Sequence, residues 1–137
     1  MYTLDELKKQ NKEIADLIDV LAILIEQPSL RENPFVCELV SRFNEKVWMH
    51  LVFEENTIYS ELSKHHNPDI SEIAGHFHGS AKNVRKNFTH YVKLWCHSTT
   101  DHAMLVDESK KIFQLIRDRI SYETNEMFPL AERHFNS

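Results

Sequence analysis

The sequence predicts an all-α fold, an up-down-up-down antiparallel four-helix bundle, and three observations support it. The 137 residues include only two Gly and four Pro, too few for the many turns of a β fold. Apolar residues recur at helical spacing in four long segments. The breaks between these segments are short, and short loops favour helices that run antiparallel to their neighbours. We expect a single domain over residues 1–137.

The first predicted helix begins at Thr3, which can form a capping box with Glu6, and extends to about Gln27. Asn33 followed by Pro34 is typical of a helix start and predicts a second helix over about 34–64. We expect the apolar residues facing the core from these two helices to be Leu4, Leu7, Ile14, Leu17, Ile18, Leu21 and Ile25, then Leu39, Phe43, Val47, Leu51, Ile58 and Leu62.

A third helix is predicted to start after Asn67-Pro68, and its periodicity fades between Cys96 and Val106, where we expect a loop that includes 98–100. Asp107 is the predicted cap of the fourth helix, which Pro129 ends or bends. The core-facing residues expected from these helices are Ile70, Ile73, Phe77, Ala81, Val84, Phe88, Tyr91 and Trp95, then Ile112, Ile116, Ile120, Met127 and Leu130.

The composition indicates where in the cell the protein resides and which kinds of partner it can bind. The formal net charge is −5 and no Lys/Arg stripe is present, which argues against nucleic acid as a partner. No apolar run is long enough to cross a membrane, and no charged-then-apolar signal segment opens the chain. We therefore expect a cytoplasmic protein without a membrane partner.

The reactive residue types are few apart from histidine. Cys37 and Cys96 share no short spacing, so we expect two reduced, partly buried thiols rather than a disulfide. No nucleophile–base arrangement, phosphate loop or nucleotide fingerprint occurs, so we do not expect an enzyme. Nine histidines are unusual for this length, and imidazole is the commonest side-chain metal ligand.

His50 and Glu54 are the polar pair that interrupts an apolar stripe. Their spacing of four places both on one face of the second helix, in line with Phe43 and Val47. Burying them costs free energy unless they pair with each other or bind something. The pattern is open to both interpretations, a metal site or a core histidine bonded to its own glutamate.

The stretch from His50 through Glu54-Glu55 to Leu62 resembles the signature of the hemerythrin-like (HHE cation-binding) family. A weaker second copy runs from Arg119 through Glu123 into the Met127 to Leu130 stretch. The resemblance implies two irons, held by histidines from four helices and bridged by two carboxylates.

Position by position, the resemblance assigns His50 as a histidine ligand, Glu54 and Glu123 as the bridging carboxylates, and His78 as a histidine of the third helix. His76 is an alternative ligand. With His50 and the two glutamates, either histidine would complete a site for one Fe²⁺ or Zn²⁺ ion.

Three positions depart from the family pattern. Asn11, Ala74 and Arg119 occupy places where the resemblance implies histidines. Arginine stays protonated and cannot bind a metal, but its planar fork of donors matches carboxylates. We therefore expect a pseudo-site in which Arg119 neutralises Glu54 and Glu123.

These residues predict a hemerythrin-like domain with an incomplete non-haem iron site. The expected cofactor is iron, as one or two ions, or none. A sensory or regulatory role is favoured over oxygen carriage. The alternative is a metal-free regulator that binds a protein, similar to the regulators of sigma factor D. A protein partner or a homodimer is expected in either case.

Overall fold

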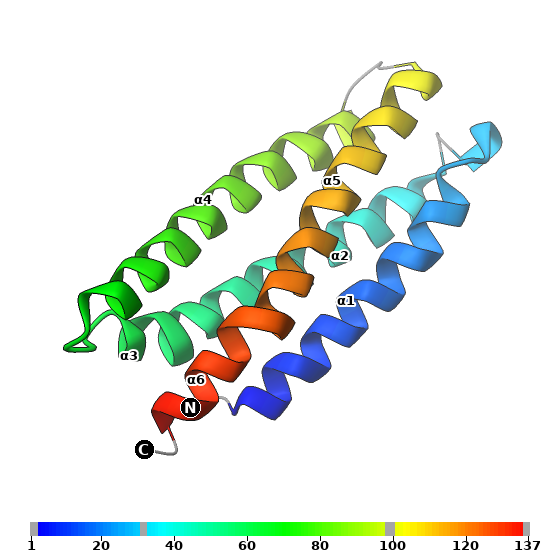
Figure 1. Ribbon diagram of the computed structural model, residues 1–137. Coiled ribbons are helices and arrows are strands. Elements are labelled where there is room, and N and C mark those ends of the chain that lie inside the picture. The colour runs from blue at the N-terminus through cyan, green and yellow to red at the C-terminus, as the bar shows by residue number, and fades with distance from the viewer. Residues whose placement is uncertain (1–2, 31–32, 98–100, 136–137) are drawn as a thin grey trace.

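The computed structural model describes residues 3–30, 33–97 and 101–135, without the side chains of residues 97 and 135, and these residues form four antiparallel helical columns (Figure 1). The first column is α1 (Leu4–Leu24), followed by the short 3₁₀ turn η1 (Pro28–Leu30). The second comprises α2 (Pro34–Glu54), the π-helical turn η2 (Glu55–Tyr59) and α3 (Ser60–Leu62). The third is α4 (Pro68–His97). The fourth comprises α5 (His102–Tyr122), the π-helical turn η3 (Glu123–Met127) and α6 (Phe128–Phe135).

The columns pack in a ring, so that each contacts two neighbours. Helix α1 packs on α2 and α5, and α4 packs on the same two helices from the opposite side. The N- and C-terminal ends lie close together at one end of the bundle (Figure 1). The predicted four-helix bundle is confirmed.

Local capping signals place the starts of α1 and α2 where the sequence predicts them. Thr3 Oγ1 accepts a hydrogen bond from the Glu6 backbone at 3.2 Å, and Glu6 accepts one from the Thr3 backbone at 3.0 Å. Asn33 caps α2 by accepting from the Phe35 backbone at 2.9 Å, with Pro34 as the first helical residue. Each cap satisfies a backbone N–H that the first helical turn cannot pair.

The predicted start of the fourth helix is wrong. Its cap is Asp101, whose carboxylate accepts from the Met104 backbone at 2.9 Å, and Asp107 lies exposed within α5. The additional turns are anchored by Leu105, which is fully buried. The helical column continues past Pro129, which lies in α6. The predicted loop at 98–100 lies outside the described residues.

Two apolar clusters fill the bundle, and a layer of polar side chains lies between them. The larger cluster occupies the half of the bundle nearest the α1–α2 connection, and the smaller one lies near the termini. Most of the expected core residues are buried, but Ile73 is 37% exposed. The smaller cluster consists of Leu7, Ile58, Leu62, Ala74, Phe77, Met127, Phe128 and Ala131.

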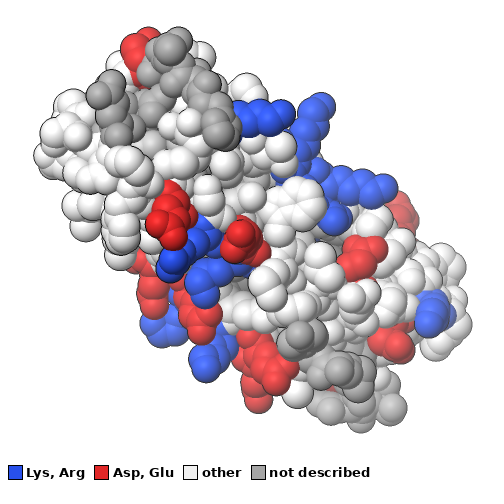
Figure 2. Space-filling view, turned by 180° about the vertical axis from the view of Figure 1, so that it is seen from behind, with Lys and Arg blue, Asp and Glu red and all other residues white. Residues whose placement is uncertain are grey.

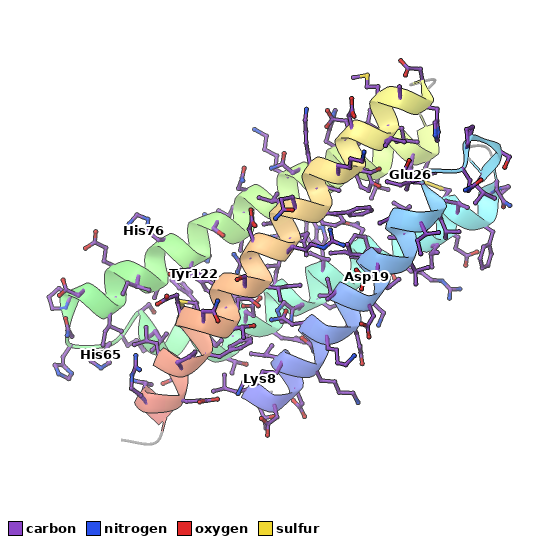
Figure 3. All side chains as sticks on the ribbon, turned by 45° about the vertical axis from the view of Figure 1, so that its right-hand side comes forward. Lys8, Asp19, Glu26, His65, His76 and Tyr122 are labelled. Atoms are coloured by element: carbon purple, nitrogen blue, oxygen red, sulfur yellow. A yellow bond between two sulfur atoms is a disulfide. The ribbon has the colours of Figure 1, made fainter. Side chains whose placement is uncertain are left out.

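Cys37 and Cys96 form a disulfide, so the expectation of two free thiols is wrong. The bond joins the first turns of α2 to the last turn of α4, with a Cα–Cα distance of 5.5 Å (Figure 3). The two residues are 59 positions apart. Sequence spacing therefore gave no sign that these two helix ends meet.

Side chains of both charges lie next to one another on one face of the bundle. Lys and Arg are interspersed with Asp and Glu on the face shown in Figure 2. Exposed ion pairs include Arg117 with Asp19 at 3.1 Å and Lys46 with Glu13 at 3.4 Å. Among the described helices, none is both long and apolar enough to span a membrane.

The capping box at the start of α1 predicts a measurable contribution to stability. Replacing Thr3 by Ala removes the hydroxyl acceptor, and we expect the free energy of unfolding to fall by about 1 kcal/mol. Replacing Thr3 by Ser keeps that acceptor and is the matched control, with little expected change. Urea unfolding followed by circular dichroism measures both, and equal stability of the two variants would contradict the prediction.

Candidate functional site

The polar layer brings together five side chains from three of the four columns. Asn11 comes from α1, His50 and Glu54 from α2, Arg119 from α5 and Glu123 from the start of η3. All five are buried, and even Arg119 is only 8% exposed. Buried charges of this kind are stable only when they are paired or hydrogen-bonded.

His50 is held through both ring nitrogens. Its Nδ1 lies 2.7 Å from Oε1 of Gln10, a carbonyl oxygen that can only accept, so Nδ1 carries a proton. Its Nε2 lies 2.8 Å from Oε1 of Glu54 and 3.0 Å from Oε1 of Glu123. The Nε2 atom therefore carries a second proton between the two carboxylates, or offers its lone pair to a cation there.

Arg119 lies beside both carboxylates. Its Nε is 3.1 Å from Oε2 of Glu123, and its Nη2 is 3.8 Å from Oε1 of Glu54. Its Nη1 donates to the hydroxyl of Ser80 at 2.6 Å and to the backbone oxygen of Phe77 at 3.3 Å. The guanidinium carbon also lies 4.2 Å from the centre of the Phe77 ring, within the range of a cation–π interaction.

The two glutamates differ in how well they are satisfied. Glu123 also accepts a hydrogen bond from the amide nitrogen of Asn11 at 2.8 Å. Neither oxygen of Glu54 accepts a hydrogen bond from a described residue, although His50 and Arg119 lie within ion-pair distance. Both oxygens of Glu54, with Oε2 of Glu123 and the side-chain oxygen of Asn11, are therefore the acceptors that a proton or a cation would satisfy.

The electrostatics of the layer follow from burial and from these contacts. Burial alone would lower the pKa of His50, but the charge of Glu54 and the hydrogen bond with Glu123 outweigh it and raise this pKa to about 9. Burial and the neighbouring charge of Glu123 raise the pKa of Glu54 to about 8. Burial would also raise the pKa of Glu123, but the hydrogen bond with His50 and its charge hold it below the ordinary value.

Both carboxylates lie where an α-helix gives way to a π-helical turn. Glu54 is the last residue of α2 before η2, and Glu123 is the first residue of η3. A π turn accommodates an extra residue and rotates the next part of the helix, and such turns are frequent at functional sites. The apolar periodicity of both segments predicts regular helices and gives no sign of these turns.

None of the described side chains of the third column is a ligand in the layer. Nδ1 of His78 bonds to Glu55 at 2.6 Å, and its ring stacks on Tyr59 with centroids 4.3 Å apart. His76 lies near Glu72 at 3.8 Å, with 80% of its side chain exposed (Figure 3). Neither histidine therefore lies with His50, Glu54 and Glu123.

The neighbouring inward positions explain this placement. Phe77 fills the position that faces the layer, and a helix cannot turn adjacent residues to the same side. Ala74 is fully buried and contributes only a methyl group, where the family resemblance implied a histidine.

The residues present fit one cation and do not fit two irons. His50, Glu54 and Glu123 each offer a ligand atom, all within 4.8 Å of one another. The side-chain oxygen of Asn11 is also buried and has no described partner. These donors suit a single divalent ion. A second ion would lack imidazole ligands, and the guanidinium of Arg119 stands beside both carboxylates that would have to bridge the pair.

A small cavity of about 130 Å³ leads from the surface to His50. It lies between α1 and α2, and its lining residues are Gln10, Glu13, Ile14, Lys46, Met49, His50 and Phe53. The volume is sufficient for several water molecules. Small solutes can therefore occupy the space beside Gln10 and His50.

Two contacts of the site were missed by sequence reasoning. Gln10 orients His50, and Ser80 binds Arg119. Neither residue lies on an apolar stripe, and Ser80 is exposed, so no periodicity marks them.

Comparison with known families agrees with this geometry. The family model described as "Hemerythrin HHE cation binding domain" matches residues 2–131, nearly the whole chain. No curated protein and no solved structure matches the sequence.

The buried ion pairs predict that Arg119 is important for stability. Replacing Arg119 by Met introduces an unbranched apolar side chain that fills part of the same space, but it removes the guanidinium that pairs with the two carboxylates. We expect the free energy of unfolding to fall by about 3 kcal/mol. The matched control is Arg117→Met, which breaks an exposed pair and should cost less than about 1 kcal/mol. Urea unfolding in the presence of a chelator measures both, and equal losses would contradict the prediction.

The titration of the layer predicts that the metal-free protein loses stability as the pH rises. The pKa of His50 is about 9 in the folded protein, above its ordinary value of 6.5. The stability that its imidazolium contributes is therefore complete below pH 6.5 and is lost as the pH rises from 6.5 to about 9. Glu54 acts in the same direction, because its pKa is raised from 4.5 to about 8 in the folded protein. The stability that its protonated form contributes is lost as the pH rises from 4.5 to about 8. His50 alone predicts a loss of roughly 3 kcal/mol between about pH 6.5 and 9, and the deprotonation of Glu54 adds to this loss between about pH 6.5 and 8.

This pH dependence is measured by urea unfolding with a chelator present. The variant His50→Gln removes one titrating group and should flatten the profile above pH 6.5. A wild-type profile without any slope in that window would show that His50 and Glu54 do not titrate there.

Proposed function

Because the chain belongs to the Hemerythrin HHE cation binding domain family, we propose that it is a sensory or regulatory protein with an incomplete non-haem iron site, rather than an oxygen carrier. The observation that carries this proposal is the contact of Arg119 with both Glu54 and Glu123. A guanidinium at this place changes which ions the two carboxylates can hold.

Electrostatics argues against a second metal ion. Two unit charges 4 Å apart interact by about 4 kcal/mol at an effective dielectric constant of 20, and a divalent ion doubles this. A second iron next to the fixed charge of Arg119 would meet this repulsion without the imidazoles that normally offset it. One ion bound by His50, Glu54 and Glu123 remains compatible with the donors present.

The residues have defined roles around such an ion. His50 and the two glutamates would hold it, and Gln10 fixes the ring of His50 so that Nε2 faces the carboxylates. An iron there would supply a redox-active centre, and the cavity lined by Gln10 and His50 gives small molecules a place next to it. This arrangement supports sensing of a metal ion or of a small reactive molecule better than storage or transport.

A second candidate function is a metal-free regulator that binds a protein partner. The same contacts favour it, because a protonated His50 and Arg119 pair with the carboxylates without any metal. In this case the layer acts only as a structural element of the bundle.

Iron stoichiometry tests the proposal. The purified protein is loaded with Fe²⁺ under anaerobic conditions, freed of unbound iron, assayed for iron and then exposed to air while its visible spectrum is recorded. We expect no more than one iron per chain and no oxo-bridged absorption bands. Two irons per chain would overturn the proposal, and none would favour the metal-free candidate.

A pair of variants shows whether Arg119 is the cause. Arg119→His introduces an imidazole in place of the guanidinium and should increase the iron content of the loaded protein. Arg117→His adds a histidine on the exposed surface of the same helix and should leave the iron content unchanged.

A further inference from the structure

The Cys37–Cys96 disulfide lies far from the polar layer. Cys37 precedes His50 by 13 residues on α2, which corresponds to about 20 Å along the helix axis. Cys96 is the penultimate residue of α4. The bond thus joins α2 and α4 at the end of the bundle opposite the termini, and it belongs to no part of the candidate metal site.

Neither cysteine is fully buried. Cys37 and Cys96 are each partly exposed, and Cys96 packs at the edge of the larger apolar cluster. Their Cα atoms are held 5.5 Å apart by two helices that are packed on each other along their length. The same helix packing can place two thiols side by side, so opening the bond does not require the helices to separate.

The two cysteines have different electrostatic surroundings. Cys37 lies in the first turns of α2, four residues after the cap Asn33, where the positive end of the helix dipole favours a thiolate. Helical side chains also point back towards the N-terminus, which brings its sulfur nearer to that end. Cys96 lies in the last turn of α4, where the dipole has the opposite sign and disfavours a thiolate.

We propose that Cys37 and Cys96 form a redox-active pair that is oxidised by peroxides and reduced by small thiols, with Cys37 as the reacting thiolate and Cys96 as the resolving thiol. The Cys37 thiolate attacks the O–O bond of hydrogen peroxide, forms a sulfenic acid and releases hydroxide, which is protonated to water. The Cys96 sulfur then attacks Cys37 Sγ, the S–S bond forms and the sulfenic oxygen leaves as a second water. Two thiols lose two electrons, which the peroxide accepts.

Reduction reverses this with two molecules of a thiol such as glutathione. The first attacks the disulfide and forms a mixed disulfide with one cysteine. The second releases that cysteine as a thiol and leaves as glutathione disulfide. Disulfides that form in a reducing compartment are commonly short-lived and catalytic or redox-sensing. Those of secreted proteins are permanent structural links. Reducibility in the folded state distinguishes these two kinds.

The wild-type chain itself provides the first test. The oxidised, folded protein is incubated with millimolar glutathione, and free thiols are counted while Trp emission and far-ultraviolet circular dichroism are recorded. We expect two thiols per chain to appear without loss of helix. Trp emission should rise, since Trp95 adjoins Cys96 and disulfides quench tryptophan. Hydrogen peroxide should then restore the bond. A disulfide that glutathione opens only after denaturant is added would be a structural link and would overturn the proposal.

Single variants test the division of roles. Cys96→Ser leaves Cys37 without its resolving partner, so peroxide should produce a sulfenic acid that dimedone labels at Cys37. The matched variant Cys37→Ser should show at least tenfold less labelling, at Cys96. Circular dichroism checks that each variant is folded, and Cys96→Ala replaces Cys96→Ser if it is not. Equal or reversed labelling would overturn the assignment of Cys37 as the reacting thiolate.

Discussion

The pairing of Arg119 with Glu123 and Glu54 is the interaction on which the rest of this bundle depends. Two carboxylates buried at one level of a helical bundle repel each other and lose their hydration, and both costs must be offset within the layer. The guanidinium and the imidazole of His50 provide that offset from different helices. The layer therefore ties α2 to α5, and Asn11 brings in α1 through its hydrogen bond with Glu123.

Such a layer also fixes the register of the columns. Apolar side chains above and below it tolerate sliding, because one leucine packs nearly as well against another. Hydrogen bonds do not tolerate it, since a shift of one turn along α1 would move Asn11 about 5 Å from Glu123. An all-apolar layer of similar volume would be as stable or more stable. The polar residues are thus better explained by specificity and by ligand chemistry than by stability.

Much of this arrangement could be predicted from the sequence, and the errors have physical causes. His50 and Glu54 lie four residues apart on an amphipathic helix, so periodicity places them on the inner face, and the family resemblance adds Arg119 and Glu123 at the same spacing. His78 bonds to Glu55 outside the layer, because the buried Phe77 takes the neighbouring inward position. Contacts between distant segments, such as the disulfide and Ser80 with Arg119, leave no periodic trace.

The two chemically distinctive sites share one helix. Helix α2 carries Cys37 near its start and His50 and Glu54 in its last two turns, with the larger apolar cluster packed between them. A helix packed in this way moves as a rigid element, so a change at one end can reach the other only by shifting the whole helix against α1 and α4. The disulfide restrains that shift at one end and the ion pairs restrain it at the other. Under the two proposals above, opening the disulfide and binding a cation would each alter one of these two restraints on α2.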